Sequence, residues 1–183
     1  VTDKAGNTTK CNKTVNVYVD KDKPTCTLTI TKGTIGKNKW YISDVTVGFD
    51  TKSDNTGGSG VKSYSIVGTE NKKKITIKKD GIYGIQGKIT DNAGNESTCG
   101  IDVKLDKTPP TCNVTKQNIN SKDGITAVFT CSDSMSSVDK CTSPKTNLKS
   151  PTNYTIKDRA GNIGTCHVDV SSKQENGSCR TAK

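Results

Sequence analysis

The stretch "ITDNAGNESTCGIDV", residues 89–103, decides the fold class of this 183-residue chain. On both sides of "DNAGN" it is rich in β-branched residues that alternate with polar ones, which predicts two strands joined by a tight turn. Ala-Gly-Asn supplies residues that tolerate a positive φ, and Asp91 can accept hydrogen bonds from the turn amides. The same Asp-x-Ala-Gly-Asn-x-x-x-Cys spacing recurs at Asp3–Cys11 and at Asp158–Cys166. We therefore expect a hairpin at the end of each of several repeats.

A second repeated element precedes the strands. It reads "DKDKPTC" at residues 20–26 and "DKTPPTC" at residues 106–112. Strand-like runs rich in Val, Ile, Thr and Tyr follow the first copy, at residues 26–31, 44–50, 61–67, 74–79, 82–90 and 99–105. Short strands separated by turn residues at regular intervals are typical of a β-sandwich, and no segment shows helical spacing of apolar residues. The predicted fold class is all-β, with immunoglobulin-like β-sandwich repeats in an extended tandem array.

Composition limits the size of each core. Apolar residues make up 29% of the chain and aromatic residues 4%, which predicts several small cores that need covalent support. Eight cysteines, one histidine and no Cys-x-x-Cys pair favour disulfides over zinc sites and indicate an oxidising, extracellular compartment. Because the chain starts at Val1 and shows no signal peptide or membrane-spanning run, we expect a segment of a longer secreted or surface protein.

The net charge of +10 comes almost entirely from lysines spread over Thr-rich, strand-like segments. Without a basic helix or interleaved aromatics this pattern argues against nucleic acid, and it favours lysines that keep strand edges soluble. The densest patch is "NKKKITIKKDG", residues 71–81. A polyanion such as a cell-wall polymer or an acidic glycan is the alternative partner for Lys72, Lys73 and Lys74.

The cysteines fit the predicted strand layout. Cys26 opens the first strand of the full repeat and Cys99 opens the last one, so a Cys26–Cys99 bridge is geometrically reasonable if these strands start at the same pole. By the same logic Cys112 pairs with Cys166. Cys131 and Cys141 then bridge neighbouring strands across the turn "SDSMSSVDK". This leaves Cys11 and Cys179 unpaired or between repeats, with a head-to-tail link between subunits as the alternative.

The predicted organisation has four parts: residues 1–23, the last strand or strands of a preceding repeat; 24–105, a complete repeat; 106–170, a compact repeat; and 171–183, a linker or the start of another repeat. The linkers contain Pro, which restrains its own backbone and that of the preceding residue. Such joints favour a stiff, extended rod over a cluster of packed domains.

"DKTPPTC", "GSGVKSYSI" and "ITDNAGNESTC" together resemble the bacterial immunoglobulin-like repeats that occur in tandem on surface proteins of Gram-positive bacteria. The resemblance covers essentially the whole chain in repeat units. It implies stalk, spacer or adhesive modules outside the cell, sometimes appended to enzymes, and it carries no catalytic residues. The cysteine pairs depart from many members of this class, which lack disulfides.

No set of residues predicts catalysis. The single imidazole, His167, lies in "CHVDV", where alternation places it on one face of a strand. Hydrolase, metalloprotease and phosphate-loop motifs are absent, and Asp50 and Asp54 lack an apolar setting that would make one of them an acid catalyst. Asp91 and Asn92 are the one calcium candidate, although a structural role in the turn is preferred. We therefore expect a protein without cofactor, metal or enzymatic activity.

Candidate contacts for a ligand lie on loops and around the single Trp. Trp is enriched at binding hot spots, although core or domain-junction packing is the preferred role for Trp40 and Tyr41. The loops at residues 51–60 and 132–140 are the expected variable surfaces. The complete set of candidate contacts is Trp40, Tyr41, Asp54, Asn55, Lys72, Lys73 and Lys74.

The function predicted from these features is a non-enzymatic extracellular structural or adhesive rod, or a segment of a surface fibre. Its partners would be neighbouring repeats or subunits. The alternatives are a specific binding module that recognises a host protein or glycan through its loops, and an accessory region of a secreted hydrolase.

Overall fold

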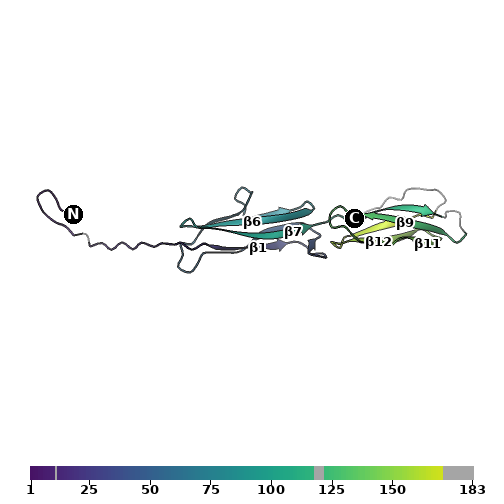
Figure 1. Cartoon of the computed structure of the whole chain (residues 1–183), viewed down its shortest axis with the longest axis horizontal. Helices are drawn as coiled ribbons and strands as arrows, with labels where there is room; N and C mark the ends of the chain where they lie inside the picture. The colour runs from purple at the N-terminus through teal and green to yellow at the C-terminus, as the bar shows by residue number, and fades with distance from the viewer. Residues whose placement is uncertain (11, 118–121, 171–183) are drawn as a thin grey trace.

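The computed structural model describes residues 1–10, 12–117 and 122–170, and these residues contain strands and no helix. Two groups of strands follow one another along the long axis of the molecule, and an N-terminal segment extends beyond the first group (Figure 1). The strands are β1 (Thr25–Lys32), β2 (Trp40–Tyr41), β3 (Val45–Ser53), β4 (Val61–Ile66), β5 (Lys74–Ile77), β6 (Gly81–Asp91), β7 (Glu96–Leu105), β8 (Thr111–Gln117), β9 (Ile125–Ser132), β10 (Val138–Lys140), β11 (Lys145–Leu148), β12 (Thr152–Asp158) and β13 (Ile163–Val168).

The first unit is made of two sheets that share one core. One sheet has the order β1-β3-β5 and the other has the order β2-β7-β6-β4. All neighbouring strands are antiparallel except β2 and β7, which pair in parallel. The core consists of alternate residues that point inward from both sheets: Leu28, Val45, Val47, Ile66, Ile77, Val103 and Leu105. The six strands predicted in this region are present, and β2 is an addition to them.

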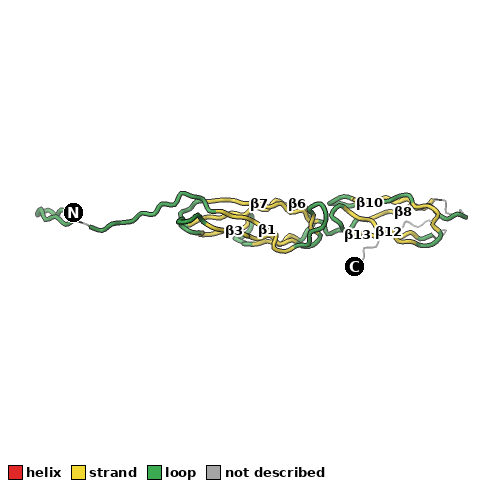
Figure 2. Tube along the Cα trace, turned by 90° about the horizontal axis from the view of Figure 1, so that it is seen from below, coloured by secondary structure: helices red, strands yellow, loops and turns green. Residues whose placement is uncertain are grey.

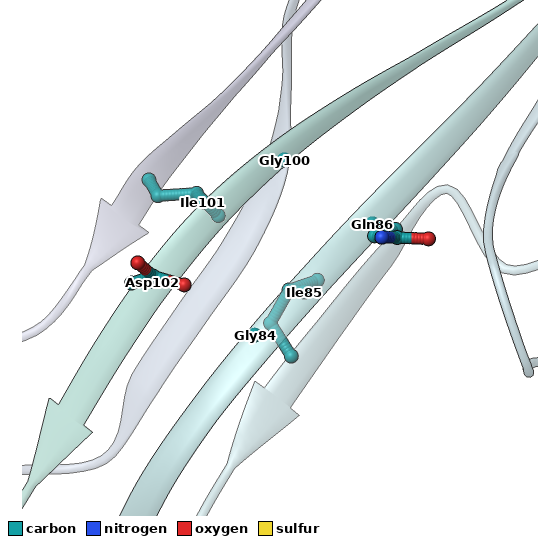
Figure 3. A pocket seen from close by; sticks show the side chains of 6 residues that line it. All are labelled: Gly84, Ile85, Gln86, Gly100, Ile101 and Asp102. Atoms are coloured by element: carbon teal, nitrogen blue, oxygen red, sulfur yellow. The ribbon is translucent and has the colours of Figure 1, made fainter.

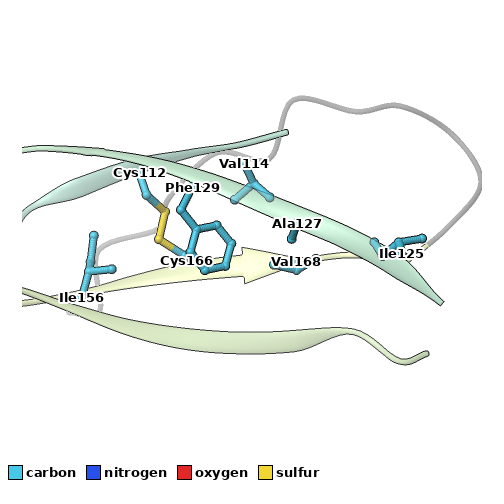
Figure 4. Packing of buried hydrophobic residues seen from close by; sticks show 8 residues of the cluster. All are labelled: Cys112, Val114, Ile125, Ala127, Phe129, Ile156, Cys166 and Val168. Atoms are coloured by element: carbon cyan, nitrogen blue, oxygen red, sulfur yellow. A yellow bond between two sulfur atoms is a disulfide. The ribbon is translucent and has the colours of Figure 1, made fainter. Parts of the chain in front are cut away.

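The second unit also has two sheets around one core, but its described residues include no counterpart of β2. Its sheets have the orders β11-β9-β8 and β10-β12-β13. Strand β8 alternates strictly between exposed and buried residues, as a strand with one solvated face must. Figure 4 shows the buried residues from both sheets packed around the disulfide Cys112–Cys166. The cluster contains one aromatic residue, Phe129, whose ring lies 5.3 Å from that of Tyr154 between centroids.

Three disulfides link these strands. Cys26 is bonded to Cys99, with 73 residues of separation, and Cys112 is bonded to Cys166, with a separation of 54. In both cases the bond connects the first strand of a unit to its last strand, as the strand layout predicted. Disulfides of this kind are typical of proteins in oxidising, extracellular compartments.

The third disulfide connects Cys131, in β9, to Cys141, which directly follows β10. This is the predicted pair, and it spans the predicted turn between two strands that follow one another in the chain. The structure adds that β9 and β10 belong to different sheets. The bond therefore joins the two sheets of the second unit at the turn that crosses between them.

The N-terminal segment carries a copy of the hairpin motif without a sandwich around it. Residues 1–10 form a small hairpin closed by a bridge between Thr2 and Thr8. From residue 12 the chain runs extended toward β1, and Figure 2 shows the tube outside the sheets as it leaves the N-terminal hairpin. It contacts the first unit at Asp20, just before β1. Its large apolar side chains are exposed: Val15, Val17, Tyr18 and Val19. Its interpretation as the last strand of a preceding repeat stays a prediction, while Cys11, Cys179 and the proposed unit at 171–183 lie outside the described residues.

Candidate functional site

The three Asp-x-Ala-Gly-Asn segments form the same hairpin. Gly6, Gly94 and Gly161 have φ values of +88°, +97° and +101°, a backbone region that favours glycine. In each copy the Asp side chain accepts hydrogen bonds from its Asn. These bonds measure 2.9 and 2.8 Å for Asp3–Asn7, 2.8 and 2.8 Å for Asp91–Asn95, and 2.8 and 2.7 Å for Asp158–Asn162. The motif therefore connects β6 to β7 and β12 to β13 as expected, with the Gly as its positive-φ residue.

In the two complete units the hairpin also holds the linker that enters the unit. The Asn95 amide donates to the carbonyl oxygen of Asp20 at 3.2 Å, and the Asn162 amide donates to that of Asp106 at 2.9 Å. The copy at residues 3–7 is exposed, and within the described part of the chain its Asp and Asn side chains bond only inside the motif. The Asn of the motif thus has a second role, because it fixes the linker from the preceding segment to the end of the last hairpin.

A serine from a third segment completes the contact. Ser59 donates its backbone N–H to the Asp20 carboxylate at 2.8 Å, and its hydroxyl accepts a bond from the Ala93 amide at 3.0 Å. Ser136 makes the equivalent bonds to Asp106, at 3.0 Å, and from Ala160, at 3.1 Å. Linker, loop and hairpin are therefore joined by the same hydrogen bonds in both units.

Each of these junctions gathers three carboxylates. We call Asp20, Asp54 and Asp91 the first Asp cluster, and Asp106, Asp133 and Asp158 the second Asp cluster. Within each cluster, one carboxylate oxygen from every Asp lies within 4.8 Å of the others. The members come from the linker, from the loop after β3 or β9, and from the hairpin after β6 or β12. Of these six residues, Asp91 was predicted from the sequence as a metal candidate and Asp54 as a ligand contact.

The second Asp cluster is the more buried one. Asp106 and Asp158 are both 0% exposed. Burial raises the pKa of Asp106 above its ordinary value, and the nearby negative charge of Asp133 raises it further, against the hydrogen bonds from Ser136 and Thr108. In the first Asp cluster the backbone and hydroxyl groups of Ser59 lower the pKa of Asp20. Three oxygen ligands in one place, without His or Cys, suit a hard cation rather than a transition metal.

Trp40 and Tyr41 pack at the junction between the two units. Trp40 is 8% exposed and its strand pairs with the end of β7, while the carbonyl oxygen of Tyr41 accepts the Asp106 amide at 2.9 Å. Tyr41 also contacts the first core. The two rings therefore do not form an exposed platform for a ligand, in agreement with the packing role preferred from the sequence.

The other candidate contacts are dispersed. Asn55 lies beside the first Asp cluster, where its amide donates to Asp22 at 3.4 Å. Lys73 reaches to 4.7 Å from the centroid of the Tyr64 ring, with Lys52 at 5.3 Å from the same ring. Lys72 and Lys74 are exposed beside it. The lysines are thus grouped around the ring of Tyr64. They lie well away from Trp40, because β4 and β2 are at opposite edges of one sheet and β5 and β1 are at opposite edges of the other.

Three further features carry no chemistry that we can assign. His167 is exposed and bonds Asn153 at 2.7 Å, and Asn92 uses its amide to donate to the carbonyl of Ser59 at 2.8 Å. A shallow depression crosses β6 and β7, where Gly84 and Gly100 present no side chain (Figure 3). Its one titratable residue is Asp102, which is not enough for catalysis.

No family model matches the chain, and no curated protein and no solved structure matches it either. The described residues include no helix with the length and apolar character needed to cross a membrane.

The linker contact leads to a prediction. Asn162→Ala removes the donor to both the Asp158 carboxylate and the Asp106 carbonyl, and leaves buried acceptors without a partner. We expect a loss of about 1–3 kcal/mol in the free energy of unfolding of the second unit, measured by urea denaturation. Asn7→Ala is the matched control, because the same motif is exposed there, and it should change stability little. Equal effects of the two substitutions would show that the linker contact is unimportant.

Proposed function

We propose that the protein is a non-enzymatic extracellular rod, made of immunoglobulin-like units in tandem, that acts as a spacer or as a structural part of a surface fibre. The repeated strand order supports this. The sheet β1-β3-β5 corresponds to β8-β9-β11, and β7-β6-β4 corresponds to β13-β12-β10. Each unit is preceded by the same Asp-Lys linker and ends with the same hairpin. Repetition of this kind builds length from modules that contact only their neighbours.

The junction between the units is the observation that carries the proposal. The loop before β2 contacts the hairpin of the second unit. The backbone amide of Lys37 donates to the carbonyl oxygen of Ala160 at 2.7 Å, and the side-chain amide of Asn38 donates to that of Arg159 at 2.9 Å. In the linker, Lys107 forms an ion pair with Asp44 at 2.7 Å and its amide bonds Asp80 at 3.0 Å. These bonds tie both the linker and the hairpin of the second unit to the first unit, which favours a fixed angle over a flexible hinge.

The disulfides also suit a chain under tension. A bond between the first and last strands keeps the intervening residues from being pulled out when force acts on the two ends of a unit. For Cys26–Cys99, with 73 residues of separation, the protected length is roughly 250 Å of extended chain. Small cores stapled in this way can therefore serve as inextensible spacers.

Binding arrays test this function against the alternative of a loop-based binding module. The loop at residues 51–60 is engaged in the first Asp cluster, where Asp54 accepts the Gly60 amide at 2.6 Å, and Trp40 is buried. We therefore expect no saturable binding on glycan and host-protein arrays. Saturable binding that is abolished by Trp40→Ala or by exchange of the loop, in variants that remain folded by circular dichroism, would contradict the spacer proposal.

A further inference from the structure

The second Asp cluster contains a carboxylate oxygen that the protein leaves unsatisfied. Asp133 accepts bonds from the amides of Met135 and Ser137, at 3.1 and 2.8 Å, both on Oδ1. Its other oxygen, Oδ2, is buried and has no hydrogen-bond partner. Asp133 as a residue is partly buried, but buried polar atoms such as this oxygen nearly always have a partner. This oxygen therefore points to a ligand that the protein itself does not supply.

No basic side chain fills this role among the described residues. The salt bridges that join one described residue to another are Lys88–Glu96 and Lys107–Asp44, and neither involves a member of the second Asp cluster. Two of its three carboxylates are completely buried, in a chain whose net charge is +10. With so many lysines available, a cluster of three acids without a cationic partner is best explained by a positive charge of another kind.

The geometry fits a single cation. Oxygen ligands bind Ca²⁺ at about 2.3–2.6 Å, so two of them on the same ion lie at most roughly 5 Å apart. The three carboxylates meet this condition, with one oxygen from each within 4.8 Å of the others. Each carboxylate oxygen has two lone pairs, so those that accept an amide hydrogen bond can also bind a metal. Mg²⁺ requires a stricter octahedron at shorter distances and binds few carboxylates.

The first Asp cluster has the same construction. Asp20 corresponds to Asp106 in the linker, and Asp91 corresponds to Asp158 in the hairpin. Asp54 comes from the equivalent loop as Asp133, although the loops differ in length. Two loops of different length that bring an Asp to the same position indicate that the position itself matters.

We propose that the second Asp cluster binds Ca²⁺, and that the first Asp cluster is a second site of the same class. Each ion connects the linker, the loop and the last hairpin at the point where the chain enters a unit. This inference rests on the two clusters alone and stands whether or not the protein acts as a spacer.

The test is a titration of the full chain with CaCl₂ after treatment with EDTA, followed by calorimetry and by thermal unfolding. We expect two bound Ca²⁺ per chain, with affinity in the range of extracellular modules, about 10⁻⁴–10⁻³ M, and a rise in the unfolding temperature with Ca²⁺ concentration. Asp133→Asn should lose one of the two sites, and Asp54→Asn should lose the other. Asp50→Asn, an exposed residue outside both clusters, is the control and should bind like the wild type.

Unfolding in EDTA separates a metal site from a structural carboxylate. Asp133→Asn keeps an oxygen that accepts the two amide hydrogen bonds and removes the unpaired charge. In EDTA the variant should therefore be at least as stable as the wild type. With Ca²⁺ present it should be less stable than the wild type. Lower stability in EDTA would indicate a merely structural role and overturn the proposal. So would the absence of binding heat at several millimolar Ca²⁺, or an equal response to NaCl of the same ionic strength. Unchanged binding by Asp54→Asn would overturn the first site.

Discussion

Replacement of Cys112 and Cys166 by alanine should unfold the second unit or reduce its free energy of unfolding by about 4 kcal/mol. The bond joins two residues that are 54 positions apart in the sequence and so restricts the conformations of the unfolded chain. Its loss increases the conformational entropy of the unfolded state. The two cysteines are also part of the core, at 4% and 0% exposure. Because the cluster around them holds one aromatic ring among eight residues, few other contacts remain to offset the loss.

The measurement is urea denaturation of the wild type and of the double variant, followed by circular dichroism. Cys131→Ala with Cys141→Ala is the matched control in the same unit. Its loop spans 10 residues, so its removal should cost less, about 3 kcal/mol by the same chain-entropy relation. An equal or smaller effect of the Cys112 and Cys166 replacement would contradict the view that the long-range disulfide compensates for a thin core.

The strands of both units follow from local patterns in the sequence. Residues such as those of β6 and β8 alternate between the core and solvent, and the turn between β6 and β7 carries the glycine that its backbone needs. These features act within a few residues, so they can be read without knowledge of the fold. The short strand β2 gives no such signal, because two residues show no alternation and its pairing with β7 depends on the tertiary structure.

The Asp clusters lie at the limit of what the sequence predicts. Asp91 was identified from its hairpin, but its partners Asp20 and Asp54 come from segments that only the fold brings together. The loops do share a signal: a strand that ends in Ser and is followed by Asp, then Ser, one small residue and Val, at 53–61 and 132–138. The distance from Asp to Ser differs between them, which hides the correspondence. Identification of this signal requires that the two repeats be aligned on their strands first.

Gly36→Ala should separate the two units and change the shape of the molecule. A Cβ atom at this position would overlap the backbone carbonyl oxygen of Ala160 and lie 2.8 Å from Cγ2 of Ile42. The carbonyl belongs to the hairpin of the other unit and cannot move without the sheet, so the contact must open. The adjacent bond from the Lys37 amide to the same carbonyl would be lost with it.

Small-angle X-ray scattering of the two-unit chain measures this change. In the wild type we expect a narrow distribution of shapes with the length of an extended molecule, since the junction bonds fix the angle between the units. In Gly36→Ala we expect a broader distribution, with each unit unfolding as before because the cores at β3 and β9 are untouched. Gly100→Ala is the control: it lies on the exposed side of β7, and its Cβ would come no closer than 3.6 Å to the carbonyl of Ile85. If Gly36→Ala scatters like the control and the wild type, the contact between the loop and the hairpin does not hold the rod straight. The stiffness must then come from the linker bonds of Asp106 and Lys107 alone.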